Sequence, residues 1–577
     1  MRQPQNCALA AVIAGLLGQI DQAHAVVSDE QYRALERRML MLEKRLEESE
    51  AAKTAAPAPR SKTPEAGLGA ATVGTAAGTA ASSVDTQEIK QLKQKVNLLE
   101  RKVEVEKENS DAKWLKLPKN VELGTQGLKV VSQDQNFIMY WRALIQADGS
   151  YFMDDTNQAG VTNGDSYADK FYLRRVRPIL EGTIWKYFDY RLMPDFGMGT
   201  TRLFDAYADI RYFREASLTA GKFKAPVSLE RLQSATALTF IELAYPTQLA
   251  PNRDVGFMLH GEFDKPGFPT DFKTLERNQT FQGNFPLYMY PDFIQYQLGV
   301  FNGSRNNGNI DSDTNDSKEV QARIFAHPFL HTGIEPLEGL GMGVAGTWGQ
   351  PNSDRLSNYQ SPGLNNIFVY NANARADGTQ YRVYPQMYWI WGPFQFVGEY
   401  ALSNLDVANQ TVVSGADHTV ASTNQTDQAW NATISYMLTG EENVFLRQGI
   451  KPRHEFDPMY GLRPDRPFNP AEGHWGAFQV AARFTTIDFD NDIFRNTGTL
   501  RAPVYPFADP RLSVSRATTW ALGVNWWLNS NVKLMADYSQ TSYNDGAGAF
   551  NSAGALTPAV QSLQTEKVWQ TRVQLGF

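Results

Sequence analysis

The chain has a single cysteine, Cys7, and after its first two dozen residues no apolar run approaches the length of a membrane helix. One thiol excludes intrachain disulfides and metal sites built from cysteines. A membrane-spanning helix needs about 18 consecutive apolar residues, and the mean hydropathy of -0.41 is that of a hydrophilic chain. These absences leave a membrane protein open, because a β-barrel shows apolar residues only at alternate positions.

Motifs of catalysis and cofactor binding are also absent. The seven histidines show no HExxH spacing, and no GxxxxGK[ST] loop occurs. The formal net charge of -7 argues against nucleic acid as a partner. We therefore expect no enzyme activity, no metal and no cofactor.

The N-terminus has the pattern of a secretory signal. Arg2 precedes an apolar stretch from Cys7 to Leu17, and Ala23-His24-Ala25 has the small-x-small form of a signal-peptidase site. We expect residues 1–25 to be removed on export, which leaves a mature chain without a thiol.

Two short coiled coils are predicted next, over residues 28–50 and 85–108, with a flexible linker rich in Ala, Thr, Pro and Gly over residues 51–84. Residues 109–136 form a connecting segment. The apolar seams recur at three- and four-residue spacings, at Tyr32, Leu35, Met39, Leu42 and Leu46, and at Ile89, Leu92, Val96, Leu99 and Val103. Each seam spans about two heptads, which is marginal for an isolated helix. We expect association with other copies of the chain; a single solvated helix is the alternative.

Residues 137–577 change to a period of two, which is typical of strands with one face toward lipid and one toward water. The last strand shows it best: Trp569, Thr571, Val573, Leu575 and Phe577 alternate with Gln570, Arg572 and Gln574. A soluble sandwich also alternates, but charges of both signs at every second position suit a water-filled lumen rather than a packed core. The prediction is an all-β, transmembrane, antiparallel β-barrel of the outer membrane.

About sixteen strands can be placed, and an even count puts both barrel ends in the periplasm. Tight turns are predicted near residues 185–187, 214–216, 391–393 and 529–531. Segments rich in Asn, Asp, Gly and Ser are predicted as extracellular loops, near residues 151–169, 227–252, 302–317, 349–380, 402–427, 487–516 and 542–565. Residues 265–291 and 439–474 are long although they fall on the side of the tight turns.

Two basic clusters are candidates for a solute pathway. In Leu173-Arg174-Arg175-Val176-Arg177, alternation puts Arg175 and Arg177 on one face, and burial of either in lipid costs about 2 to 4 kcal/mol near the midplane. Arg174 then needs a β-bulge or a place at the interface. The second cluster holds Lys222 and Lys224, followed by a segment from Pro226 that we expect to fold inward and narrow the pore.

Arginine suits anion passage, because its guanidinium group presents a fork of donors to phosphate oxygens. A row of such groups in a narrow pore raises the local anion concentration. The alternative is that these cations pair with wall carboxylates as ordinary ion-pair networks, for which the sequence offers Asp189, Asp195, Asp205 and Asp209.

Several stretches between residues 170 and 577 occur in an order that resembles the phosphate-selective porin O and P family. They are Arg174-Arg175-Val176-Arg177-Pro178, Glu181-Gly182, Gly221 to Arg231, Asn252-Arg253-Asp254-Val255-Gly256-Phe257, Gly299-Val300-Phe301-Asn302-Gly303, Tyr436 to Glu441, and Arg572-Val573-Gln574-Leu575-Gly576-Phe577. The resemblance implies a homotrimer of sixteen-stranded barrels with an arginine-rich path to a constriction. It implies that Arg174 and Arg175 are the first arginines on that path, that Arg231 and Ser234 belong to the constriction, and that Phe577 is read by the outer-membrane assembly machinery.

The hypothesis is a passive channel in the bacterial outer membrane for small anions, phosphate or polyphosphate. Its surroundings would be lipid and lipopolysaccharide, and a trimeric base would hold the coiled coils together as a periplasmic stalk. The anion pathway would comprise Arg174, Arg175, Arg177, Lys222, Lys224, Arg231, Ser234 and Arg253. A general or differently selective porin of the same fold remains open, as does a trimeric protein that tethers the envelope through a barrel anchor.

Overall fold

The structure is a computed structural model that describes Arg101 and residues 121–124, 127–153, 167–267, 293–312, 316–413, 416–443, 450–451, 468–499, 502–547 and 561–577. Residues Pro118–Phe577 form one compact unit. The predicted signal peptide, the linker and both coiled coils, apart from Arg101, lie outside the described residues.

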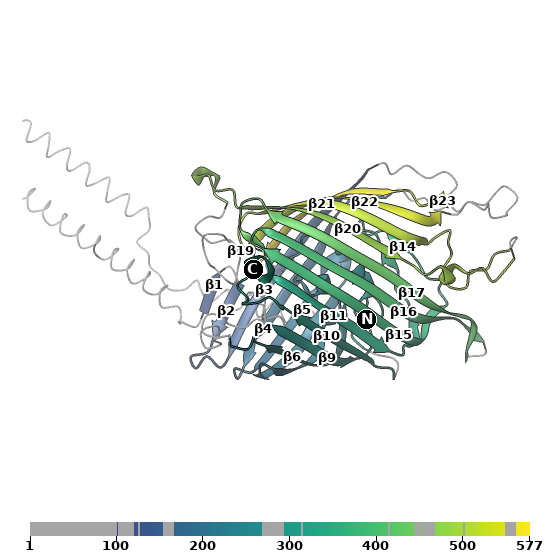
Figure 1. Cartoon of the computed structure of the whole chain (residues 1–577), viewed down its shortest axis with the longest axis horizontal. Helices are drawn as coiled ribbons and strands as arrows, with labels where there is room; N and C mark the ends of the chain where they lie inside the picture. Colours follow the sequence, from purple (N-terminus) through teal and green to yellow (C-terminus); the bar gives the residue numbers. More distant parts are fainter. Residues whose placement is uncertain are drawn as a thin grey trace, which may run out of the picture. The chain divides into compact units, whose positions relative to one another are not determined.

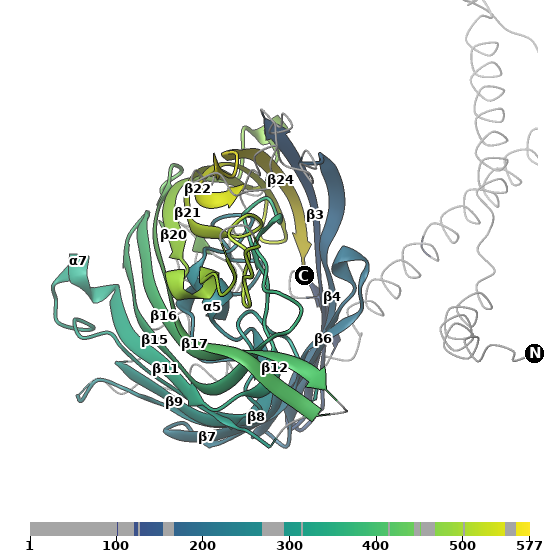
Figure 2. The same ribbon diagram turned by 90° about the vertical axis from the view of Figure 1, so that its right-hand side faces the viewer.

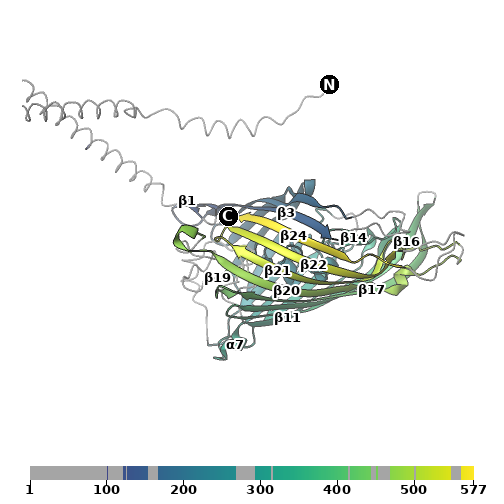
Figure 3. The same cartoon turned by 90° about the horizontal axis from the view of Figure 1, so that it is seen from above.

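Sixteen antiparallel strands form a closed barrel, as the sequence predicted (Figures 1 and 3). The first and last wall strands pair, with Gln146 opposite Gln574, so the wall has no free edge. The wall strands are β3 (Ile138–Met153), β4 (Lys170–Ile184), β5 (Phe188–Asp195), β6 (Arg202–Phe213), β7 (Ala216–Lys224), β8 (Arg253–Phe263), β9 (Ile294–Phe301), β10 (Glu319–Ala326), β11 (Leu340–Gly349), β15 (Ala374–Trp391), β16 (Phe394–Val413), β17 (Ala416–Met437), β20 (Ala477–Asp488), β21 (Val514–Trp527), β22 (Val532–Ala547) and β24 (Glu566–Gly576).

Short elements extend this wall or lie in its connections. The hairpin of β1 (Val121–Gly124) and β2 (Gly127–Val131) pairs with β3, inside the predicted connecting segment. The others are β12 (Asn352–Arg355), β13 (Tyr359–Gln360), β14 (Asn366–Phe368), β18 (Glu442–Asn443), β19 (Ile450–Lys451), β23 (Gln561–Ser562), η1 (Gly197–Gly199), α4 (Leu229–Leu232), α5 (Pro246–Leu249), α7 (Glu335–Glu338), η2 (Pro470–Glu472) and η3 (Asn491–Phe494). No helix in the described part of the chain is long and apolar enough to cross a membrane.

The alternation in the wall follows the sequence. In β24 the side chains of Trp569 and Val573 are 47% and 55% exposed, whereas Arg572 between them is 1% exposed. Apolar side chains thus cover the outside and polar ones face inward, as lipid and a hydrated lumen require.

Tight turns join the strands at residues 185–187, 214–215, 392–393 and 528–531, as predicted. The predicted loop at residues 402–427 differs from the structure, because β16 and β17 continue as a paired hairpin through it. The segment contains Thr and Val, which favour strands, among the Asn and Asp that suggested a loop. Most of the long stretches at residues 265–291 and 439–474 lies outside the described residues.

Part of the lumen is apolar, which the sequence analysis did not expect. The β7–β8, β11–β15 and β20–β21 connections contribute Tyr245, Phe368 and Phe489 to one cluster, in which the Phe368 and Phe489 rings stack at 4.2 Å. Wall strands meet this cluster with small side chains, Ala401 and Ala429 among them. Figure 2 looks along the barrel and shows α5 inside the ring of strands.

Candidate functional site: a basic cavity inside the barrel

A cavity of about 480 Å³ lies between the wall and the β7–β8 connection. Among the described residues, cations outnumber carboxylates in its lining. The cations are Arg142, Arg177, Arg191, Lys224, Arg253, Arg323 and Lys533, and the carboxylates are Glu181, Asp205, Glu335 and Glu338. Basic side chains therefore outnumber acidic ones at this surface.

Two of the predicted arginines, Arg177 and Arg253, share one aromatic platform. Their guanidinium carbons lie 4.3 Å and 4.6 Å from the centre of the Phe204 ring. Arg177 Nε also contacts Asp195 Oδ2 at 2.6 Å, and Arg253 Nε contacts Asp205 Oδ1 at 3.1 Å. The ring and the carboxylates fix the orientation of both guanidinium groups.

Two further arginines in the lining, Arg142 and Arg191, were not among the residues predicted for the anion pathway. Arg142 and Arg191 each contact Glu181, at 3.2 Å, and Arg191 also lies 3.3 Å from Asp205. Arg142 belongs to β3, Glu181 to β4 and Arg191 to β5. The three residues lie on three different strands, so only the strand register, with Glu181 opposite Arg191, brings them together.

The lysines of the second cluster serve different parts of the lumen. Lys224 lines the cavity and donates hydrogen bonds to the backbone oxygens of Leu232 and Gln233, at 3.2 Å and 2.6 Å. Lys222 instead forms an ion pair with Asp311 in the β9–β10 connection. Ser234, the neighbour of Gln233, lines the cavity as well.

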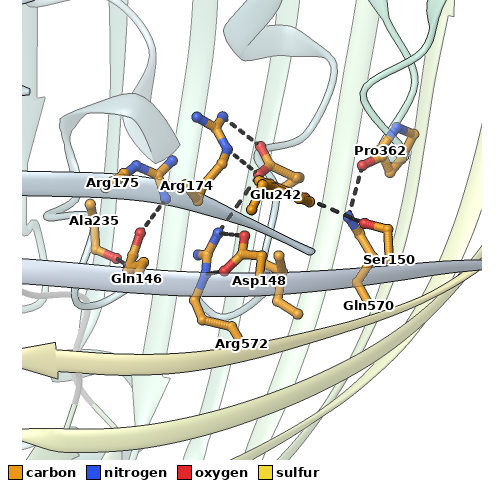
Figure 4. A network of polar contacts seen from close by, with 12 residues as sticks. Gln146, Asp148, Ser150, Arg174, Arg175, Ala235, Glu242, Pro362, Gln570 and Arg572 are labelled. Carbon is orange, nitrogen blue, oxygen red and sulfur yellow. Dashed lines mark hydrogen bonds and ion pairs between the residues drawn. The ribbon is translucent and has the colours of Figure 1, made fainter. Parts of the chain in front are cut away.

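Arg174 occupies a β-bulge, one of the two arrangements predicted for it. Gln146 lies opposite Arg175 and Ala147 opposite Leu173, so Arg174 is left over in the register. The bulge turns both Arg174 and Arg175 to the inner face (Figure 4). Neither lines the cavity; Arg174 pairs with Glu242 at 2.6 Å, and Arg175 donates to Gln146 Oε1 at 2.6 Å.

Arg231, predicted for the constriction, lies in α4 and is 7% exposed. It donates to the backbone oxygen of Thr247 and to Asn307 Oδ1, the latter at 3.0 Å. Burial and the nearby Arg253 lower the pKa of Arg231 to about 10, so it stays charged at neutral pH. It does not line the cavity but joins two connections.

The β7–β8 connection is tied to strands far along the wall. Glu399 of β16 accepts hydrogen bonds from Ser228 Oγ at 3.2 Å and Leu229 N at 3.0 Å. Asp537 of β22 accepts one from Ile241 N at 2.6 Å. Buried carboxylates thus satisfy backbone donors that have no partner within the connection.

A closed sixteen-stranded barrel with an apolar outside and a charged lumen is the fold of an outer-membrane porin. The family described as phosphate-selective porin O and P matches residues 145–566. The chain belongs to this family.

The chain is also similar to one curated protein and to several solved structures. Porin O of Pseudomonas aeruginosa is 24% identical over 443 residues, which cover 71% of this chain and 84% of that protein. Among solved structures, OmpT of Vibrio cholerae is 10% identical, with a TM-score of 0.41 over 78% of this chain and 99% of its own. The anion-selective porin from Comamonas acidovorans is 8% identical, with a TM-score of 0.41 over 76% of this chain and 100% of its own.

Proposed function

We propose that this porin is a passive channel for small anions, with phosphate and polyphosphate as its solutes. The observation that carries the proposal is the excess of cations over carboxylates in the lining of the cavity. In a narrow, partly desolvated passage such an excess concentrates anions and repels cations. The description of the family as phosphate-selective supports phosphate as the solute.

The β7–β8 connection supports a narrowed passage in this proposal. Its residues Leu229, Gln233 and Ser234 line the cavity, as do Arg177 and Arg253 of the wall. In this proposal an anion in the cavity meets guanidinium donors from the wall and the polar side chains of Gln233 and Ser234 from the connection. Of the predicted residues, we assign four to the pathway itself: Arg177, Lys224, Ser234 and Arg253. The other four do not line the cavity and contribute only through their charge or their contacts: Arg174, Arg175, Lys222 and Arg231.

A general porin of the same fold is the second candidate, and the ion pairs of the lining favour it. Arg142, Arg177 and Arg253 each contact a carboxylate. If pairing cancels their field, the channel passes cations and anions alike.

Planar-bilayer conductance of the refolded porin separates these candidates. In a KCl gradient we expect the sign of the reversal potential to show that chloride permeates more readily than potassium. We also expect added phosphate to block the chloride current. Arg253→Ala should weaken the block by about tenfold, the size of one desolvated charge contact. Arg516→Ala is the matched control, because Arg516 pairs with Asp488 and is 55% exposed. A reversal potential near zero, or equal effects of both substitutions, would support the general porin.

We also infer a homotrimer with the predicted coiled coils as a periplasmic stalk. The two seams are too short to be stable alone, and a trimer supplies the partners that they lack.

A further inference from the structure

A carboxylate from the β7–β8 connection lies in the middle of an arginine cluster on the wall. Glu242 accepts hydrogen bonds from Arg174 Nε at 2.6 Å and Arg174 Nη2 at 3.0 Å. Arg572 Nη2 lies 3.7 Å from the same carboxylate. Figure 4 shows Glu242 between these two guanidinium groups, which reach it from β4 and β24.

Arg175 belongs to the same cluster but has a neutral acceptor. It donates to Gln146 Oε1 at 2.6 Å. The amide of Gln146 donates in turn to Ala235 O at 3.0 Å and to Gln574 Oε1 at 2.7 Å. Ala235 and Gln574 both line the cavity, so the cluster lies directly behind the lining.

Arg572 is held by a second carboxylate as well. Its Nε and Nη2 each donate to Asp148 at 2.7 Å. Its Nη1 is buried and has no hydrogen-bond partner among the described residues. Three guanidinium groups thus face two carboxylates, and Glu242 is the one of these two that comes from the connection rather than the wall.

We propose that Glu242 is a specificity-determining residue. Its negative charge offsets the positive charge of Arg174 and Arg572, which lowers the positive potential in the cavity and so sets how strongly the channel attracts anions. A carboxylate and a phosphate present similar oxygens to a guanidinium group, so Glu242 acts as a tethered anion. Its removal adds one positive charge behind the lining without changing the lining itself. The inference rests on the proposed anion channel and adds a residue that tunes it.

The test compares phosphate block and reversal potential in four variants of the full-length porin. Glu242→Gln should lower the half-blocking phosphate concentration by at least about threefold and shift the reversal potential toward anions. Arg174→Gln should raise that concentration, because Glu242 then faces Arg175 and Arg572. The double variant Arg174→Gln with Glu242→Gln should return close to wild type.

Glu230→Gln is the matched control. Glu230 belongs to the same connection and pairs with Arg483 of β20, so this substitution changes the net charge equally and loosens the same segment. We expect a smaller change in block than for Glu242→Gln. Equal effects of the two, or a half-blocking concentration in Glu242→Gln at or above that of wild type, would overturn the proposal.

The experiments distinguish a failure of the proposed anion channel from a failure of the proposed role of Glu242. A wild-type porin without anion selectivity contradicts the proposed function, whereas the order of the variants relative to wild type still decides the role of Glu242. Folding of each variant is checked by heat-dependent migration in SDS gels. If Glu242→Gln does not fold, Arg174→Gln decides: unchanged or tighter phosphate block in that variant also overturns the proposal.

Discussion

Arginine has two separable roles inside this barrel. Arg382 of β15 is 1% exposed, and it donates to Glu319 Oε2 at 2.6 Å, to Asn306 Oδ1 at 2.8 Å and to Ser304 O at 3.2 Å. It therefore fixes the β9–β10 connection to the wall. Arg177 and Arg253, in contrast, line the cavity. Arginine therefore fixes a connection to the wall in one place and contributes positive charge to the cavity lining in the other.

The sequence predicts the face of an arginine more completely than its partner. Alternation placed Arg175, Arg177 and Arg572 inside, and all three side chains are buried. The acceptor of Arg177, Asp195, lies on the next strand, whereas the acceptor of Arg572, Asp148, lies at the other end of the barrel sequence. Such a pair depends on closure of the barrel, which local spacing does not encode, and this is why the lining was only partly predicted.

The pH dependence of the Glu242 contact is a prediction at the residue scale. Glu242 lies in a connection, outside the membrane-spanning strands. Burial raises its pKa, but the ion pair and hydrogen bond with Arg174, together with the nearby Arg175 and Arg572, lower it by more, to about 2 from 4.5. A folded-state pKa below the unfolded one stabilises the fold at higher pH. The stability advantage of wild type over Glu242→Gln should therefore be constant from pH 7 to 5 and disappear between about pH 4.5 and 2.

Urea unfolding of both proteins in detergent micelles, followed by tryptophan fluorescence, measures this advantage. Arg174→Gln with Glu242→Gln is the reference in which the pair is absent. An advantage that is already lost between pH 7 and pH 5 contradicts the assigned ion pair.

At the scale of elements, one segment changed its assignment from loop to strand. Residues 402–427 carry the Asn, Asp and Ser of a loop, yet each residue from Phe394 to Val413 has a partner in β17. Thr411 lies opposite His418, beyond the last pairs with the neighbouring strands, Ala374 with Asn409 and Gln428 with Asp488. Composition alone does not distinguish a polar hairpin from a loop, because Asn, Asp, Ser and Thr occur in both.

Shortening of this hairpin should leave the channel unchanged. We expect replacement of residues 411–418 by an Asn-Gly turn to preserve folding, single-channel conductance and phosphate block, because none of the residues that the structure describes in this segment lines the cavity. The β20–β21 connection provides a contrast, since it contributes Phe489 and Phe507 to the apolar cluster, and its deletion should change conductance. Loss of folding in the shortened hairpin would show a further role for its tip.

At the scale of the whole molecule, the strands of the wall could be predicted from the sequence, whereas the apolar cluster inside the barrel could not. Alternation, turn residues and the terminal strand gave the barrel and its strand number. The apolar cluster joins three connections that are distant in sequence, and their aromatic residues have no period that marks them as interior.

The stalk prediction is tested on the assembly. Deletion of residues 28–108 should lower the temperature at which trimers dissociate in SDS, because the two seams then no longer associate. Conductance and phosphate block per barrel should stay as in wild type. Deletion of residues 51–84 alone is the control, since it keeps both seams. Identical dissociation temperatures for all three proteins would contradict a stalk that stabilises the trimer.

The bulge at Arg174 has a consequence for how the sequence of such a pore can change in evolution. Removal of this one residue leaves Phe171 and Leu173 outside and Arg175 and Arg177 inside, in regular alternation. Loss of one residue from a regular part of the strand would instead turn the side chains on one side of the deletion to the opposite face. A single inserted codon at such a position adds a charge to the interior while every other side chain keeps its face. Bulges are thus places where a barrel gains or loses pore charges without redesign of its wall.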